Sequence, residues 1–146
     1  MSPLPRRLRP EPSSEVLALL MPIRNGFLQL HKALLEAERR SYELVHGRVS
    51  NAQFLQLLIN EPSLAWLQPL LKFVVTIDEA LEAETAITLP MAYELMQTAK
   101  ALLKPNETGS VEAQRFSQLL QDNDVVHVYA ELRRYLHQQD AHRHDK

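Results

Sequence analysis

The chain has 146 residues, with 16 basic and 18 acidic side chains, 3 glycines, 9 prolines and no cysteine. This length suits one domain with an ordinary hydrophobic core, and a formal net charge of −2 provides no broad positive field for nucleic acid or an anionic membrane. Three isolated glycines exclude the glycine-rich nucleotide-binding loops. Without cysteine the chain has no disulfides, thiolate zinc sites or iron–sulfur clusters.

Residues 1–12 hold four prolines and three arginines, a composition that predicts an extended arm outside the fold. We interpret the arm as a disordered terminus, and a basic docking segment is the alternative. The longest apolar run, residues 16–23, has eight residues, far fewer than the roughly twenty that span a membrane. We therefore expect a cytoplasmic protein without a membrane partner.

A long amphipathic helix is predicted from Ser13 or Ser14 to Gly47. Apolar residues recur along it at steps of three and four, and a second adjacent seam widens the apolar face. A face of this width is typical of a bundle helix and not of a two-stranded coiled coil. Pro22 could split off the first turn, whereas Gly47 is placed to end the helix. Gly26 lies inside the helix and calls for an explanation such as close approach of a neighbouring helix.

Five further helices are predicted after this one. Those near residues 63–83, 89–104 and 125–138 are expected to pack against the long helix, and the short ones near 51–60 and 111–121 are expected to act as lids or connectors. The predicted N-caps are Ser50, Ser63, Thr88, Ser110 and Asp124.

The sequence therefore predicts an all-α, single-domain helical bundle over residues 13–138, with a long N-terminal helix and two short connector helices. No stretch alternates with the period of two that strands require. The polar, His-rich residues 139–146 are predicted to be a disordered tail. Pro69 marks either the start of the helix that contains it or a kink within that helix.

Four polar side chains lie at or beside the apolar faces: His31, Glu38 and Tyr42 on the long helix, and Asp78 on the 63–83 helix. His31 and Glu38 are about 10 Å apart along a helix and cannot touch, yet both could border one pocket that Asp78 enters. One hypothesis is a ligand-binding or enzymatic site in which His31 and Asp78 form a proton-bearing pair. The alternative, which we favour, is a structural hydrogen-bond network at the margin of the core.

The pair Glu43-x-x-His46 has the spacing that carboxylate-bridged di-iron bundles use, and Asp124-x-x-His127 is a poor second copy. Such a centre also needs a glutamate from each of two other helices, and His46 lies next to a helix-ending glycine. We predict no metal site and no cofactor. No serine arrangement resembles an activated nucleophile, so no catalytic residue is assigned.

Trp66 is the only tryptophan, and we expect it to anchor the turn after Pro62 in the core. Its alternative role is an exposed contact with a partner, because tryptophan is enriched in interface hot spots. Basic residues of the long helix alternate with acids at i, i+4 spacing, which is typical of a salt-bridged surface. Nucleic-acid binding is therefore not favoured.

Several motifs between residues 28 and 82 resemble those of a known family. They are LHKAL at 30–34, YE at 42–43, HG at 46–47, FLQLLINEP at 54–62, AWL at 65–67 and IDEAL at 77–81. In these motifs the chain resembles a small all-helical bacterial family without an assigned function. The resemblance implies a bacterial cytoplasmic source, and it brings no activity, cofactor or catalytic residue to this chain.

We predict a non-enzymatic module for protein–protein interaction or regulation, because no complete catalytic set is present. Surplus leucine on the short helices leaves room for a homodimer. A small-ligand-binding or enzymatic bundle that uses the four polar residues is the alternative. An enclosed cavity lined by those residues would favour a ligand, and a flat exposed apolar patch would favour a partner.

Overall fold

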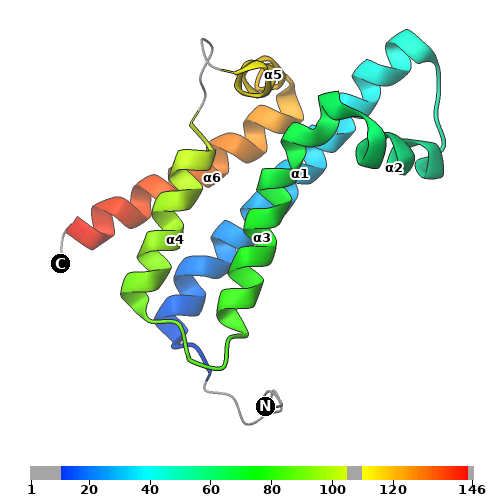
Figure 1. The fold of residues 1–146 in the computed structure, drawn as a ribbon. Coiled ribbons are helices and arrows are strands. Elements are labelled where there is room, and N and C mark those ends of the chain that lie inside the picture. The colour runs from blue at the N-terminus through cyan, green and yellow to red at the C-terminus, as the bar shows by residue number, and fades with distance from the viewer. Residues whose placement is uncertain (1–10, 105–109, 145–146) are drawn as a thin grey trace.

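A computed structural model describes residues 11–104 and 110–144 of the chain. Within these ranges the fold consists of six α-helices and one 3-10 helix, with no strand (Figure 1). The predicted all-α class with a long N-terminal helix is thereby confirmed. The predicted arm at residues 1–12 lies outside the described residues except for its last two positions.

The first helix, α1, spans Ser14–His46 without interruption. It is capped by Ser13, whose hydroxyl oxygen accepts the Val16 N–H at 3.2 Å. At the other end, Gly47 has a φ of 83°, a left-handed conformation that glycine adopts without the strain a side chain would cause. The Gly47 N–H donates to the Glu43 carbonyl at 2.9 Å, as expected for a residue that ends a helix.

Pro22 does not split α1, and a side chain from another helix compensates for its missing N–H. Proline cannot donate to the carbonyl four residues earlier, which here belongs to Ala18. The hydroxyl of Tyr135 donates to the carbonyls of Ala18 at 2.9 Å and Leu19 at 2.8 Å. Burial and the neighbouring Tyr93 raise the pKa of Tyr135 to about 12, so the hydroxyl keeps its proton at neutral pH.

Replacing Tyr135 with phenylalanine is expected to lower the free energy of unfolding by about 1.5 kcal/mol, because the Ala18 carbonyl loses its donor and the partly buried bond to the Leu19 carbonyl is lost as well. Urea denaturation followed by circular dichroism measures this loss. In a Pro22→Ala background the backbone supplies an N–H to the Ala18 carbonyl, and we expect the cost of Tyr135→Phe to fall by about 1 kcal/mol. An equal cost in both backgrounds would show that the hydroxyl does not act through the proline.

The other elements follow α1 in chain order. They are α2 (Asn51–Asn60), the 3-10 helix η2 (Pro62–Leu67), α3 (Gln68–Leu81), α4 (Leu89–Leu102), α5 (Val111–Leu119) and α6 (Asn123–His144). The hydroxyls of Ser50, Thr88 and Ser110 cap α2, α4 and α5 as predicted. In the described part of the chain, no helix combines the length and the apolar character needed to cross a bilayer.

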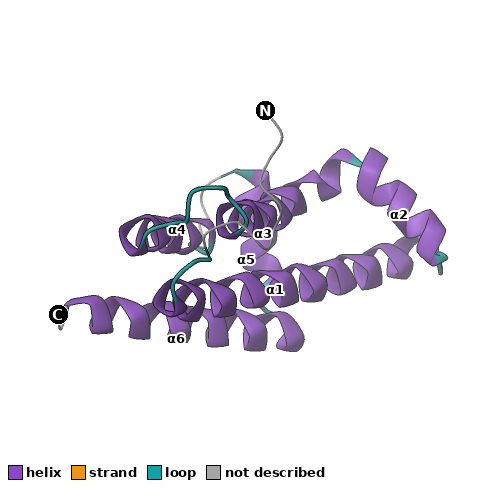
Figure 2. Cartoon of the chain, turned by 90° about the horizontal axis from the view of Figure 1, so that it is seen from below, coloured by secondary structure: helices purple, strands orange, loops and turns teal. Residues whose placement is uncertain are grey.

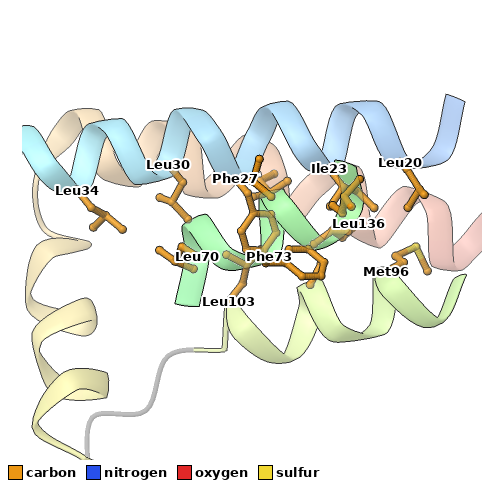
Figure 3. Close-up of a cluster of buried hydrophobic side chains, with 14 of the residues drawn as sticks. Leu20, Ile23, Phe27, Leu30, Leu34, Leu70, Phe73, Met96, Leu103 and Leu136 are labelled. Atoms are coloured by element: carbon orange, nitrogen blue, oxygen red, sulfur yellow. The ribbon is translucent and has the colours of Figure 1, made fainter. Parts of the chain in front are cut away.

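The core lies between α1, α3, α4 and α6. The helix α6 runs along α1, and α3 and α4 form a second layer (Figures 1 and 2). Figure 3 shows the labelled α1 side chains pointing at those of the neighbouring helices. Fully buried members of this core include Leu20, Ile23, Phe27, Leu30, Leu34, Ile77, Met96 and Leu103. The first apolar seam of the long helix is therefore buried as predicted from Leu20 to Ala37. The predicted second seam is wrong at Leu28 and Val45, which are exposed, and the first seam ends early because Leu44 is 88% exposed.

Gly26 is explained by the close approach of α6. A Cβ atom at this position would lie 2.6 Å from Cδ1 of Leu132, whose side chain is itself buried. The predicted close helix approach is thus present. The absence of a side chain lets the two longest helices pack tightly where they meet.

Two helix starts differ from those predicted. The hydroxyl of Ser63 caps no helix, because η2 has no side-chain cap and α3 begins only at Gln68, with Pro69 in its first turn. Of the two alternatives for Pro69, the helix start is therefore correct. Asp124 does not cap α6 either, since the carboxylate of Asp122 accepts the N–H groups of Asp124 at 3.0 Å and Val125 at 3.2 Å.

The last helix is longer than predicted. Residues 139–144 are helical where the sequence predicts a disordered tail. Two contacts with α4 hold this extension in place. Lys100 forms an ion pair with Asp140, and the guanidinium of Arg143 stacks over the ring of Tyr93 at 4.6 Å from its centroid. Polar composition alone is a poor guide here, because these long side chains bind α4 through charge and ring contacts.

Candidate functional site

Glu38 is a buried charged residue near the C-terminal end of α1, with only 5% of its surface exposed. Its carboxylate accepts hydrogen bonds from two other elements. The Trp66 indole N–H of η2 donates to Oε2 at 3.1 Å. Arg115 of α5 donates to Oε1 from Nε at 2.8 Å and also from Nη2. A buried carboxylate is costly unless it is paired and hydrogen-bonded, and these donors meet that requirement.

Local sequence explains why these groups converge. Pro62 starts the short η2 helix, which places Trp66 one turn later against the core. The Trp66 ring also lies 6.2 Å from that of Phe116. Arg115 directly precedes Phe116 on α5, so the packing that anchors the phenylalanine also sets the position of the guanidinium. The Glu38–Trp66–Arg115 network thus joins α1, η2 and α5.

An open groove of about 350 Å³ lies beside this network, and we call it the α1–η2–α5 groove. Its lining residues are Glu38, Ser41, Tyr42, Val45, His46, Pro62, Ser63, Leu64, Trp66, Val111, Glu112 and Arg115. Val45 and Val111 are each 78% exposed. The rings of Tyr42 and His46 stack at 4.3 Å between centroids. The groove therefore has apolar and aromatic walls around a floor made by the ion pair of Glu38 and Arg115.

The structure divides the four predicted polar residues. Glu38 and Tyr42 line the groove, but Asp78 binds Arg24 instead, with Oδ1 2.6 Å from Nε and Oδ2 3.2 Å from Nη2. The hypothetical pair of His31 and Asp78 is therefore not formed. Burial lowers the pKa of His31 below its usual value, and the ring has no hydrogen bond with any described residue.

The carboxylate and imidazole of Glu43-x-x-His46 serve other contacts. Glu43 accepts the Val49 N–H at 2.9 Å and lies 3.8 Å from Arg39. His46 stacks on Tyr42. In the second motif, Nε2 of His127 faces its own helix neighbour Glu131 at 3.3 Å. Across the described ranges, no three side chains of the types that bind metals are grouped around one point.

Trp66 combines features of both predicted roles. It packs partly buried against the core, as the anchoring role requires, and it also lines the groove. Its role as a contact for a partner stays a prediction.

Sequence reasoning missed the two arginines that complete these sites, Arg24 and Arg115. Both lie on amphipathic helices, next to apolar residues that are buried. An arginine at such a position indicates that a carboxylate from another helix lies nearby. Arg115 is 77 positions from Glu38, so spacing within one helix cannot reveal the pair.

No protein-family model matches this chain, and neither does a curated protein or a solved structure. The resemblance to a bacterial helical family therefore stays a prediction.

Proposed function

We propose that this chain is a non-catalytic helical module that binds a protein partner, and that an apolar side chain of the partner enters the α1–η2–α5 groove. The observation that carries the proposal is the contrast between the walls and the floor of the groove. Val45 and Val111 expose most of their surface to solvent. Exposed apolar groups of this kind, next to aromatic side chains, are typical of protein contact sites.

The floor of the groove supports a binding role over catalysis. A general base needs a lone pair that can reach a substrate proton. Both carboxylate oxygens of Glu38 already accept hydrogen bonds, from Trp66 and Arg115. These hydrogen bonds leave Glu38 poorly placed to act as a general base, and we propose that burial of an apolar side chain against Val45 and Val111 is the main interaction in the groove.

The apolar surface extends beyond the groove. Leu44, next to Val45, is 88% exposed, and Leu55 and Ile59 of α2 are also exposed. Figure 1 shows α2 and the end of α1 projecting from the rest of the bundle. A partner seated in the groove could bury these side chains as well, which would add to the apolar area removed from water.

The proposed setting is the cytoplasm of a bacterial cell, and the lack of cysteine in the sequence fits a reducing compartment. A second copy of this chain is one candidate partner. A site for a small ligand that uses the four polar residues is the weaker alternative, because only Glu38 and Tyr42 line the groove.

The test compares the wild type with Val45→Lys and with a control, Val126→Lys, at an exposed valine of α6 outside the groove. Proteins retained from an extract of the source cell are identified by mass spectrometry and purified. Binding is then measured by interferometry, and self-association by sedimentation equilibrium. We expect Val45→Lys to weaken the interaction by about tenfold or more, and Val126→Lys to leave it unchanged. Absence of both a partner and self-association, or equal loss in the two variants, would contradict the proposal.

A further inference from the structure

A second cavity lies between α4 and α6, on elements that do not form the α1–η2–α5 groove. It has a volume of about 400 Å³, and we call it the α4–α6 cleft. The polar side chains that line it are Gln97, Lys100 and Lys104 of α4 and its C-terminal end, and Arg133, His137 and Asp140 of α6. A volume of this order suits a small molecule.

Basic groups outnumber acidic ones in this cleft. Lys100 forms an ion pair with Asp140, and Gln97 donates to the same carboxylate at 3.5 Å. Among the described residues, Lys104 and Arg133 have no ion pair, and neither does His137. The chain as a whole has a net charge of −2. Within the described part of the molecule, no carboxylate balances the positive charges of Lys104 and Arg133 in this cleft.

The helix dipole does not account for the basic residues of α6. If the last helix ended near residue 138, Arg133 and His137 would lie close to its C-terminal end, where cations stabilise a helix through its dipole. Because α6 continues to His144, both residues lie in its interior, where the favourable effect of the dipole is lost. They are four residues apart and therefore share one face, which is the face that lines the cleft.

The guanidinium of Arg133 is held in place by Tyr129. Its Nη1 donates to the Tyr129 hydroxyl at 2.9 Å, and the group lies over the ring at 5.7 Å. That hydroxyl in turn donates to the Leu103 carbonyl at 2.9 Å. The remaining N–H groups of Arg133 have no partner among the described residues. An oriented guanidinium with free donors is suited to bind two oxygens of one anion.

We infer that the α4–α6 cleft binds a small phosphate-bearing anion, such as a phosphate ester or pyrophosphate. Arg133 supplies directional donors, and Lys104, just beyond the end of the facing helix, supplies a further positive charge, whereas the charge of Lys100 is balanced by Asp140. This inference is independent of the proposed partner groove. Failure of one proposal would leave the other unaffected.

The experiment titrates the ¹⁵N-labelled, untagged full chain with pyrophosphate at constant ionic strength, and calorimetry gives the affinity. We expect saturable shifts of the amides around residues 100–104 and 133–137. Arg133→Gln should weaken binding by about tenfold, because it removes a charge-assisted, two-pronged contact. Arg134→Gln is the matched control, since it removes the same charge from the next residue, which does not line the cleft. It should change the affinity by less than about twofold.

Three results would overturn the inference. They are shifts that do not saturate, equal weakening in Arg133→Gln and Arg134→Gln, or binding of succinate as tight as that of pyrophosphate, which would indicate general attraction of anions. Circular dichroism establishes that Arg133→Gln is folded. If it is not, Lys104→Gln at the exposed end of α4 replaces it, with the same expected loss of affinity relative to Arg134→Gln.

Discussion

Replacing Phe27 with alanine is expected to lower the free energy of unfolding by about 4 kcal/mol. The side chain is fully buried at the centre of α1, and its ring lies 4.8 Å from that of Phe73 on α3. Figure 3 shows the Phe27 ring next to that of Phe73 in the cluster of buried side chains. Truncation removes the transfer free energy of the ring and also leaves a cavity that the surrounding helices cannot fill. Urea denaturation measures the loss.

The matched control is Leu28→Ala, at the next residue of the same helix. Leu28 is 41% exposed, because the turn of the helix directs it away from the core. Its truncation should cost less than about 1 kcal/mol. A similar loss in both variants would mean that α1 presents a different face to the bundle.

The first apolar seam of α1, to which Phe27 belongs, could be predicted from the sequence, whereas the predicted second seam is wrong at Leu28. The apolar positions of the first seam repeat at the helical period over many turns, so one error does not shift the predicted face. The N-caps at Ser50 and Ser110 could also be predicted, because each depends on a hydrogen bond between residues close in the sequence. The residue that caps α6 could not be predicted, because Asp122 and Asp124 are both suitable N-cap residues. The backbone conformation between them determines which of the two carboxylates caps the helix.

The candidate site was only partly predictable, for a related reason. Glu38 and Tyr42 could be identified because they interrupt or border an apolar pattern. Their surroundings depend on which helices meet, and a single sequence holds no signal for contacts that join α1 to α5. Asp78 illustrates this limit, because its position beside the core was apparent but its partner, Arg24, lies 54 residues away. A carboxylate at the edge of the core pairs with the cation that the fold brings nearest to it, and the sequence alone does not show which cation that is.

Removing Arg115 is expected to have the second largest effect. The Arg115→Ala variant leaves the carboxylate of Glu38 buried without its cation, and breaking such a pair commonly costs 3–5 kcal/mol. Arg115 keeps 31% of its side chain exposed, so water can enter after truncation, and we expect a loss of about 3 kcal/mol. Arg40→Ala is the control. It breaks the ion pair with Asp122, but Arg40 is half exposed, so the loss should stay under about 1 kcal/mol.

A second substitution separates charge from packing. In the Arg115→Ala background, Glu38→Gln removes the unpaired charge and keeps an oxygen that can accept the Trp66 N–H. We expect it to recover about 1 kcal/mol or more, whereas Glu38→Gln alone should destabilise the protein because Arg115 then loses its counter-charge. If Glu38→Gln lowers stability equally in both backgrounds, Arg115 stabilises the fold through contacts other than its ion pair. The floor of the α1–η2–α5 groove would then not be a neutral pair, and the case for an apolar occupant would lose its main support.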